Sequence, residues 1–355
     1  MNLNNQIGRN KIMIHENDNQ MYELLIYIPT YNRERKLENC LKIIEREIKG
    51  FEDKVCIYVS NNGSSDGTEK LLDSYKSDWL IYRSHDENKG AFLNIIAAYD
   101  LPIKAKFVWI IGDDDYLLPN AISDLLEKII ENPEIDFIFC NTTAFPAADH
   151  DSIMKNYLES GIIGIGNIKS NIYKNLEKVD FEKLIDPKIA DTLLGELMVL
   201  CFRQEKFCFP YQKAVELNNK LQPTIGKDSC TLNEFGIISQ PHNIGLMENL
   251  QSTTKALYNP LPKTFNFWGS AGEWLGNYDY VFPVIILFLI KQYRERKIIN
   301  NEKYLYLIDY YFKIMQGSFQ RQLTGTSPAN KFTDKLKAEF FDAIFELGLA
   351  KGLFK

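Results

Sequence analysis

Hydrophobic residues in the first 145 positions alternate between short continuous runs and sets at helical spacing. A continuous run such as 24–28 predicts a strand buried on both faces. Between the runs, apolar residues recur every three or four positions, as from Leu37 to Ile48. Strands that alternate with helices of this length predict an α/β fold, a mostly parallel sheet flanked by helices. The predicted strands are 24–28, 55–60, 80–82, 107–111 and 135–140.

This rhythm fails after Asn141. The apolar segment 193–202 is compatible with a helix or a strand, and aromatic residues become frequent from about residue 256. Beyond Tyr280 the apolar spacing is helical again. We therefore expect a flexible segment over 1–20, two halves of one α/β domain over 21–145 and 146–255, and a C-terminal aromatic and helical region over 256–355.

Composition and charge narrow the functional class. The chain has 355 residues, 45% of them hydrophobic and 25% charged, as in folded globular proteins. The net charge of −6 argues against a nucleic-acid-binding protein. Residues 281–355 hold twelve Lys or Arg and seven Asp or Glu, a balance of +5 on an otherwise acidic chain. An anionic surface partner and a solvated helical face both explain that balance.

Cysteines and the N-terminus favour a cytoplasmic protein. None of the six cysteines forms a C-x-x-C pair or a cluster with zinc spacing, which suits a reducing compartment. Met1–Gln20 lacks the apolar stretch of a signal peptide. The longest apolar run, 281–290, is far short of the roughly 20 residues that span a bilayer.

Candidate chemistry gathers where the predicted strands end. Three consecutive carboxylates, Asp113–Asp115, follow the strand at 107–111, with Gly112 as the hinge. Adjacent carboxylates repel one another, so a fold that presents them together usually needs a cation, and Mg²⁺ or Mn²⁺ suits such ligands. An acidic turn in solvent is the alternative. The other loops at strand ends are 29–33, 61–68, 86–90 and 141–145.

The residues of these loops predict a nucleotide-diphosphate site with a bridging metal. In a parallel sheet they converge on the edge where ligands of open α/β folds bind. The sequence contains neither G-x-x-x-x-G-K-[ST] nor a G-x-G-x-x-G after the first strand. A P-loop and a dinucleotide site are thereby excluded.

Four motifs in series resemble the signature of family 2 glycosyltransferases, which have the GT-A fold. They are IPTYNR at 28–33, the segment 59–68, NKG at 88–90 and WIIGDDDYLLP at 109–119. The resemblance spans 22–145 and, more loosely, continues to about residue 255 towards O-antigen and capsule sugar transferases. It implies a Rossmann-like domain, a nucleotide-sugar donor, a DXD-type motif that holds Mn²⁺ or Mg²⁺, and inversion at the anomeric carbon.

The resemblance also assigns residues. Asp114 and Asp115 would be the metal ligands. Asn61 stands where many relatives have an Asp that contacts the base, so the base stays open, with a UDP-sugar favoured. The implied donor-binding residues are Pro29, Thr30, Tyr31, Asn32, Arg33, Asn61, Asn62, Lys89, Gly90, Asp113 and Asp114.

Inverting transfer also needs a base for the incoming hydroxyl. Asp228, in the segment TIGKDS, is the first candidate, although an Asp there is equally suited to cap the following helix. Glu196 is the second candidate. Trp268 and Trp274 are candidate acceptor-binding residues, because aromatic rings suit sugar stacking.

We thus expect an inverting, metal-dependent transferase that builds a surface glycan of the capsule, O-antigen or lipooligosaccharide type. A lipid-linked acceptor would bring it to the inner face of the cytoplasmic membrane, and a homo-oligomer stays open. One alternative is a non-catalytic glycan- or nucleotide-sugar-binding protein on the same fold. A sugar nucleotidyltransferase is a weaker alternative, because the loop 29–33 has no glycine to grip a triphosphate.

Overall fold

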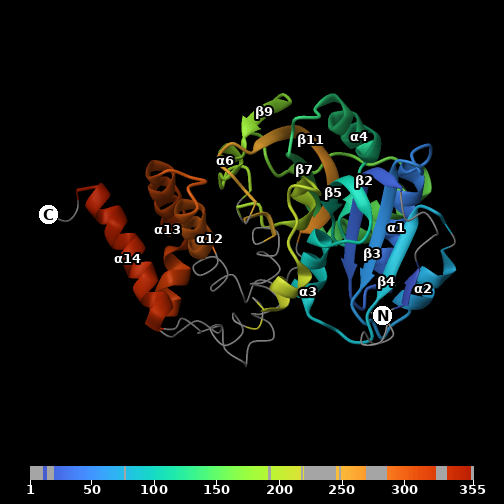
Figure 1. The fold of residues 1–355 in the computed structure, drawn as a ribbon, viewed down its shortest axis with the longest axis horizontal. Helices are drawn as coiled ribbons and strands as arrows, with labels where there is room; N and C mark the ends of the chain where they lie inside the picture. Colours follow the sequence, from blue (N-terminus) through green and yellow to red (C-terminus); the bar gives the residue numbers. More distant parts are fainter. Residues whose placement is uncertain are drawn as a thin grey trace, which may run out of the picture.

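The computed structural model describes residues 11–13, 20–75, 77–190, 193–216, 219, 245–247, 249–268, 286–324 and 334–352. One sheet runs through the body of the molecule (Figure 1). Its order is β1-β4-β3-β2-β5-β10-β7-β11-β6, with β8 beside β7 and β9 beside β11. The strands are β1 (Lys11–Met13), β2 (Met21–Thr30), β3 (Val55–Asn61), β4 (Leu80–Ser84), β5 (Lys104–Ile110), β6 (Tyr116–Leu117), β7 (Phe137–Pro146), β8 (Asn167–Ile168), β9 (Glu177–Asp180), β10 (Leu200–Arg203) and β11 (Lys255–Trp268).

The longer strands run parallel, as predicted. β2 pairs in parallel with β3 and β5, β3 with β4, and β7 with β11. β10 is antiparallel to both β5 and β7, so those two strands point the same way. The continuous apolar runs in β2, β3 and β5 are buried on both faces, which is why they show no alternation. The predicted α/β class with a mostly parallel sheet is confirmed.

Helices connect the strands and pack against the sheet. Helix α1 buries its apolar residues Leu37, Cys40, Leu41 and Ile44 in the core. The helices of the body are α1 (Glu34–Glu47), α2 (Thr68–Ser74), α3 (Ala91–Ile96), α4 (Ala121–Glu131), α5 (His150–Ser160) and α6 (Phe181–Leu184). Short 3-10 turns occupy Ala97–Tyr99, Ala147–Asp149 and Leu197–Val199.

The sequence placed the boundary between the α/β domain and the C-terminal region at 255/256, and this position falls at the start of β11. β11 pairs with β7 from Ala256 to Trp268 in one sheet with the first strands. Its Phe265 is buried against Tyr116 and Tyr157. Residues 256–268 therefore belong to the sheet and not to the helical region. The aromatic content there reflects a buried strand.

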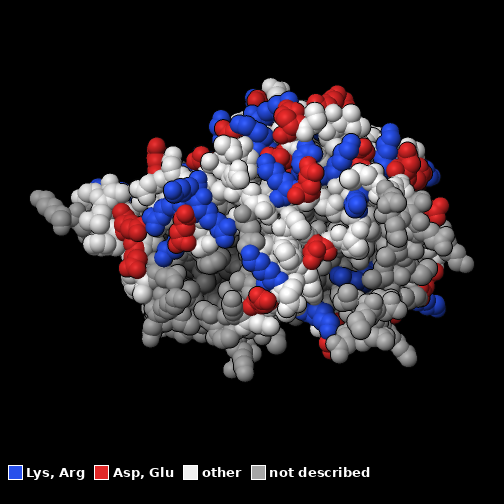
Figure 2. Space-filling view, in the orientation of Figure 1, with Lys and Arg blue, Asp and Glu red and all other residues white. Residues whose placement is uncertain are grey.

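Three helices follow and lie together at one end of the molecule (Figure 1): α12 (Leu287–Glu295), α13 (Asn301–Leu323) and α14 (Asp334–Ala350). Basic side chains gather over α12 and α13 beside acidic ones (Figure 2). Arg294 pairs with Glu346 at 2.7 Å, and Lys313 pairs with Asp309 at 2.6 Å. Arg294 and Lys313 are thus paired with acidic side chains of these helices. Among the described residues, no helix is long and apolar enough to cross a membrane.

Candidate active site

The candidate site lies where β2 and β5 end side by side. β2 pairs with β5 up to Tyr27 and Ile110, and the amide of Ile111 donates to the carbonyl of Tyr27 at 3.0 Å. Beyond these residues the two strands separate and lead into the loops 31–33 and 111–115. The carboxyl ends of neighbouring parallel strands thereby bring Thr30 to the triple Asp, 83 residues away.

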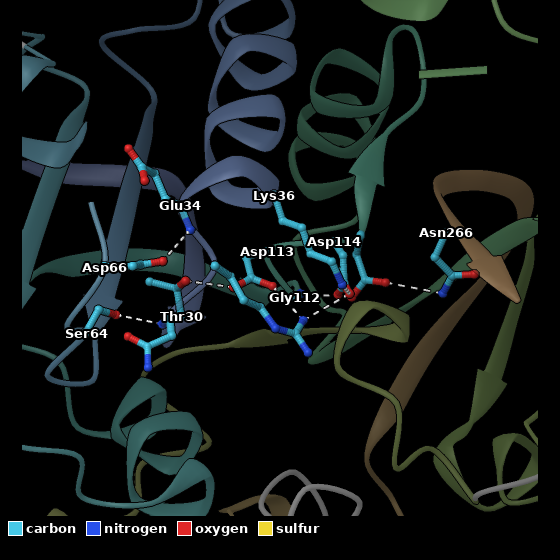
Figure 3. Close-up of polar contacts among 12 residues, drawn as sticks. Thr30, Glu34, Lys36, Ser64, Asp66, Gly112, Asp113, Asp114 and Asn266 are labelled. Carbon is cyan, nitrogen blue, oxygen red and sulfur yellow. Dashed lines mark hydrogen bonds and ion pairs between the residues drawn. The ribbon is translucent and has the colours of Figure 1, made fainter. Parts of the chain in front are cut away.

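Asp113 is buried and is held from the β2 side. The hydroxyl of Thr30 donates to Oδ2 of Asp113 at 2.7 Å, and Nη1 of Arg33 lies 3.0 Å from Oδ1 (Figure 3). The side chain of Asp113 is only 4% exposed. Both of its oxygens therefore have a donor, and its carboxylate is fixed in one orientation.

Asp114 is the most accessible carboxylate of the three, with its side chain 35% exposed. Nη1 of Arg33 lies 3.0 Å from Oδ2 of Asp114, and Nζ of Lys36 lies 2.7 Å from the same oxygen. Lys36 comes from the first turn of α1, so this helix start and the β2 loop face the triple Asp together (Figure 3). Arg33 bridges two of the three carboxylates.

Asp115 turns the other way. Its Oδ2 accepts from the amide of Gly112 at 2.8 Å, and its Oδ1 accepts from Nδ2 of Asn266 at 3.3 Å. A Cβ at position 112 would lie 2.8 Å from Oδ2 of Asp115. Glycine at 112 thus allows the carboxylate to fold back onto the backbone. β11, which carries Asn266, completes this side of the site (Figure 3).

The electrostatics divide the three carboxyl groups. Burial, aided by the neighbouring Asp114, raises the pKa of Asp113 to about 6 and that of Asp115 to about 7. Burial also favours the neutral form of Asp114, but Arg33 and Lys36 outweigh it and lower the pKa of that carboxyl. When all three carboxyl groups are ionised, Arg33 and Lys36 leave one formal negative charge at the site. An added cation would be favoured there.

The loop after β2 is fixed against the loop after β3. Asn32 has φ 52°, a left-handed conformation that Asn tolerates. Its amide donates to Oγ of Ser64 at 2.8 Å, and its Oδ1 accepts from the amide of Ser65 at 2.7 Å. The amide of Glu34 donates to Asp66 at 3.1 Å. These bonds hold Arg33 in place from both sides, while Tyr31 is exposed and Pro29 half-buried.

Asn61 and Asn62 organise the third loop of the edge. Nδ2 of Asn61 donates to Oγ of Ser84 at 3.1 Å. Oδ1 of Asn62 accepts from the amide of Lys89 at 2.9 Å, and its Nδ2 donates to Asn88 at 2.8 Å. Both Asn side chains are buried. They shape the backbone around Lys89, and their amide groups are largely used within the protein.

Gly90 has φ 88°, which a residue with a side chain rarely adopts. Its amide donates to Oδ1 of Asn88 at 2.8 Å. The Lys89 ammonium pairs with Glu87 at 2.5 Å on the surface. The motif at 88–90 is therefore a tight turn that leads into α3.

The donor set fits a hard divalent cation. Asp114 supplies a partly exposed carboxylate and Asp115, next in the chain, a buried one, and such ions are commonly held by a couple of carboxylates plus substrate phosphates. In the part of the chain that the structure describes, no three His, Cys, Asp or Glu side chains form a group that could hold a metal by themselves. Further ligands would have to come from a bound molecule.

Two of the four candidate base and acceptor residues, Glu196 and Trp268, fall in described parts of the chain. Glu196 precedes the 3-10 turn before β10 and forms an ion pair with Lys169. Trp268 is the last residue of β11. Asp228 and Trp274 lie outside the described residues.

Two residues at the site were not predicted from the sequence. Lys36 could have been found, because it lies three positions after Arg33 and so on the same side of a helix start. Asn266 had no local signal, because it lies 151 residues from its partner Asp115 in a segment assigned to another region.

Comparisons with known proteins agree with this picture. Residues 25–192 match the family model "Glycosyl transferase family 2". The abequosyltransferase RfbV of Salmonella typhimurium is 32% identical over 117 residues, which cover 32% of this chain and 34% of RfbV. The match therefore spans about a third of the length of that relative.

Solved structures share the fold. A crystal structure of S. aureus TarS 1–349 superposes with a TM-score of 0.51 at 14% identity, covering 90% of this chain and 78% of that one. The mannosyltransferase PcManGT from Pyrobaculum calidifontis, in complex with GDP-Man and Mn²⁺, gives a TM-score of 0.50 at 13% identity, covering 97% and 84%. At such identities the likeness is one of fold.

Proposed function

Because residues 25–192 belong to the glycosyl transferase family 2, we propose that the protein transfers a sugar from a nucleotide-diphosphate sugar to a hydroxyl of a growing surface glycan. The transfer is metal-dependent and inverts the anomeric carbon. The likeness to an abequosyltransferase supports transfer of a sugar. A UDP-sugar is the first donor to test.

One observation carries the proposal. Thr30 and Arg33 from the end of β2 contact Asp113 and Asp114 from the end of β5, and Asn266 from β11 contacts Asp115. An acidic turn in solvent would not be bonded by side chains from β2, from the loop after it and from β11. The cluster sits at the edge where open α/β sheets bind their ligands.

The chain's own residues have distinct roles in the proposal. Thr30 and Arg33 hold Asp113 rigidly. Its carboxylate would accept a hydrogen bond from a ribose hydroxyl of the donor. Arg33 and Lys36 supply positive charge beside the place of the diphosphate. Asn61 and the turn at 88–90 form the floor around the nucleoside.

Asp114 and Asp115 are the residues that would hold Mn²⁺ or Mg²⁺. When bound, the ion neutralises charge that develops on the departing diphosphate. Asp114 is partly exposed, whereas Asp115 is buried and is oriented by Asn266 and Gly112. The same fold holds Mn²⁺ with GDP-Man in PcManGT, which supports testing that ion first.

The reaction requires a proton acceptor on the far side of the sugar. The acceptor oxygen forms a bond to the anomeric carbon, the bond from that carbon to the diphosphate oxygen breaks, and the hydroxyl proton passes to a carboxylate. We propose Asp228 for this role, with Glu196 as the alternative. Lys169 engages the Glu196 carboxylate, so Glu196 would have to exchange that partner in order to act.

The test is a hydrolysis and transfer screen of UDP-, GDP-, CDP- and dTDP-sugars with Mn²⁺ or Mg²⁺, read out as released nucleoside diphosphate. We expect turnover of one donor class that stops in EDTA. Turnover that persists in EDTA would refute the metal dependence. Tight donor binding without any turnover, with glycan acceptors present, would favour the non-catalytic alternative.

A further inference from the structure

Two cations from one short segment share the carboxylate of Asp114. Nζ of Lys36 lies 2.7 Å from Oδ2 of Asp114, and Nη1 of Arg33 lies 3.0 Å from the same oxygen. Arg33 also reaches Asp113 at 3.0 Å and is thus anchored at two points. Within the described residues, Asp114 is the one ion-pair partner of Lys36.

The carboxylate of Asp114 would also be a ligand in the proposed metal site. A divalent ion that binds Asp114 must contend with the ammonium already on Oδ2. Lys36 is the weaker of the two cationic partners, because an ammonium on a flexible stem is a point charge, whereas the Arg33 guanidinium bridges two carboxylates. The Lys36 and Asp114 side chains are each more than a third exposed, so solvent weakens their pairing.

We propose that Lys36 is an internal competitor of the divalent cation at Asp114 and thereby sets the metal affinity of the site. This inference rests on the metal-dependent function proposed above. An ion held by Asp114 would displace the Lys36 ammonium, whereas Arg33 would keep its contact with Asp113. The displaced ammonium remains on the first turn of α1, beside the place of the donor's diphosphate, and is free to meet its charge.

Competition and support predict opposite changes in metal affinity when Lys36 is removed. A residue that helps to build a metal site lowers the affinity when removed, whereas a competitor raises it. The pair is partly exposed, so the expected change is modest, about two- to fivefold. Electrostatics at long range cannot account for such a change if a lysine elsewhere on α1 has no effect.

The experiment measures Mn²⁺ binding to the purified protein by electron paramagnetic resonance of free Mn²⁺, without nucleotide. Lys36→Met should bind Mn²⁺ about two- to fivefold more tightly than the wild type, and Lys36→Arg should stay close to the wild type. Lys42→Met is the matched control, because Lys42 lies on the same helix and pairs with Glu38 in solvent. It should leave the affinity unchanged.

The outcomes distinguish this inference from the proposed function. Unchanged or weaker binding by Lys36→Met, with wild-type binding intact, overturns the competition and leaves the metal site standing. A tighter Lys42→Met also overturns it, because the effect would then be general charge. Absence of Mn²⁺ binding in both the wild type and Lys36→Met overturns the competition. The metal dependence falls with it only if nucleoside diphosphates also bind equally well in Mn²⁺ and in EDTA.

Discussion

Strands β4, β3, β2 and β5 come from one continuous stretch of chain, whereas β10 and β11 enter the same sheet from residues 200 and 255 onwards. Helices connect the strands of the first group, and the loops that follow these strands lie at the carboxyl edge of the sheet. The second group flanks β7 on both sides, with β10 antiparallel and β11 parallel to it. Both groups nevertheless contribute to the carboxylate cluster, since Asn266 of β11 contacts Asp115.

The difference separates two kinds of contribution. The early strands carry the donor and metal residues on loops fixed by neighbouring strands. The later segments close the site around them and, in our proposal, supply the base. Variants in the second group should therefore alter turnover or closure while donor recognition by the first group persists.

The largest effect is expected for the base. Asp228→Asn should lower kcat by about two to four decades, the usual range for a lost acid–base group, with donor affinity little changed. Glu196→Gln is the matched comparison and should cost far less. Steady-state kinetics with donor affinity measured separately checks this. A fall for Glu196→Gln alone would move the role to Glu196, and a destabilised but kinetically normal Asp228→Asn would assign Asp228 to a helix cap.

The second effect concerns the stability of β11 in the core. Phe265 is fully buried, with ring contacts to Tyr116, Phe145 and Tyr157. Phe265→Ala should lower the free energy of unfolding by about 3–5 kcal/mol. Leu261→Ala, in the same strand but 59% exposed, should change it by less than about 0.5 kcal/mol. Urea denaturation measures both, and equal small effects would show that β11 is an appendage.

A third effect tests whether the second group tunes the first. Asn266 donates to Oδ1 of Asp115 at 3.3 Å, a long hydrogen bond that orients a proposed metal ligand. Asn266→Ala should weaken Mn²⁺ binding by about tenfold, the low end for a residue that supports a ligand. Titration with Mn²⁺ reports this directly. An unchanged Mn²⁺ affinity would mean that β11 closes the site without shaping it.

The smallest effect is a pH dependence within the first group. Burial, with the charges of Arg83 and Lys89, lowers the pKa of His85 to about 4. Because the folded pKa lies below the unfolded value of 6.5, His85 contributes stability above pH 6.5, and this contribution is lost as the pH falls towards 4. His85→Gln should flatten the fall in melting temperature between pH 6.5 and 4. Parallel curves for both proteins would contradict the assignment.

The sequence predicted the first group well because its signals are local. Continuous apolar runs mark β2, β3 and β5, and the glycine and polar residues that follow mark their loops. The proximity of Thr30 to Asp113 follows from the parallel arrangement alone. The sequence pattern did not predict which cation contacts each carboxylate, because nothing in the sequence distinguishes Lys36 from other helical lysines.

The second group was harder because its contacts are distant in sequence. β11 reads as an aromatic segment, and only its pairing with β7 shows that Tyr258 and Phe265 are core residues. The hydrophobic pattern of a strand does not show which earlier strand it will pair with. The ion pair of Glu196 with Lys169 joins residues 27 positions apart and had no signal of its own.

The most direct test of the account is the binding of nucleoside diphosphates with and without Mn²⁺. By calorimetry, one of UDP, GDP, CDP or dTDP should bind with Mn²⁺ and lose at least about tenfold in affinity in EDTA, as expected when the ion bridges carboxylate and phosphate. Asp114→Asn should remove the Mn²⁺ effect, whereas Asp53→Asn, at an exposed site before β3, should keep it. Equal affinity with Mn²⁺ and EDTA, or a full Mn²⁺ effect in Asp114→Asn, would contradict the proposed metal site.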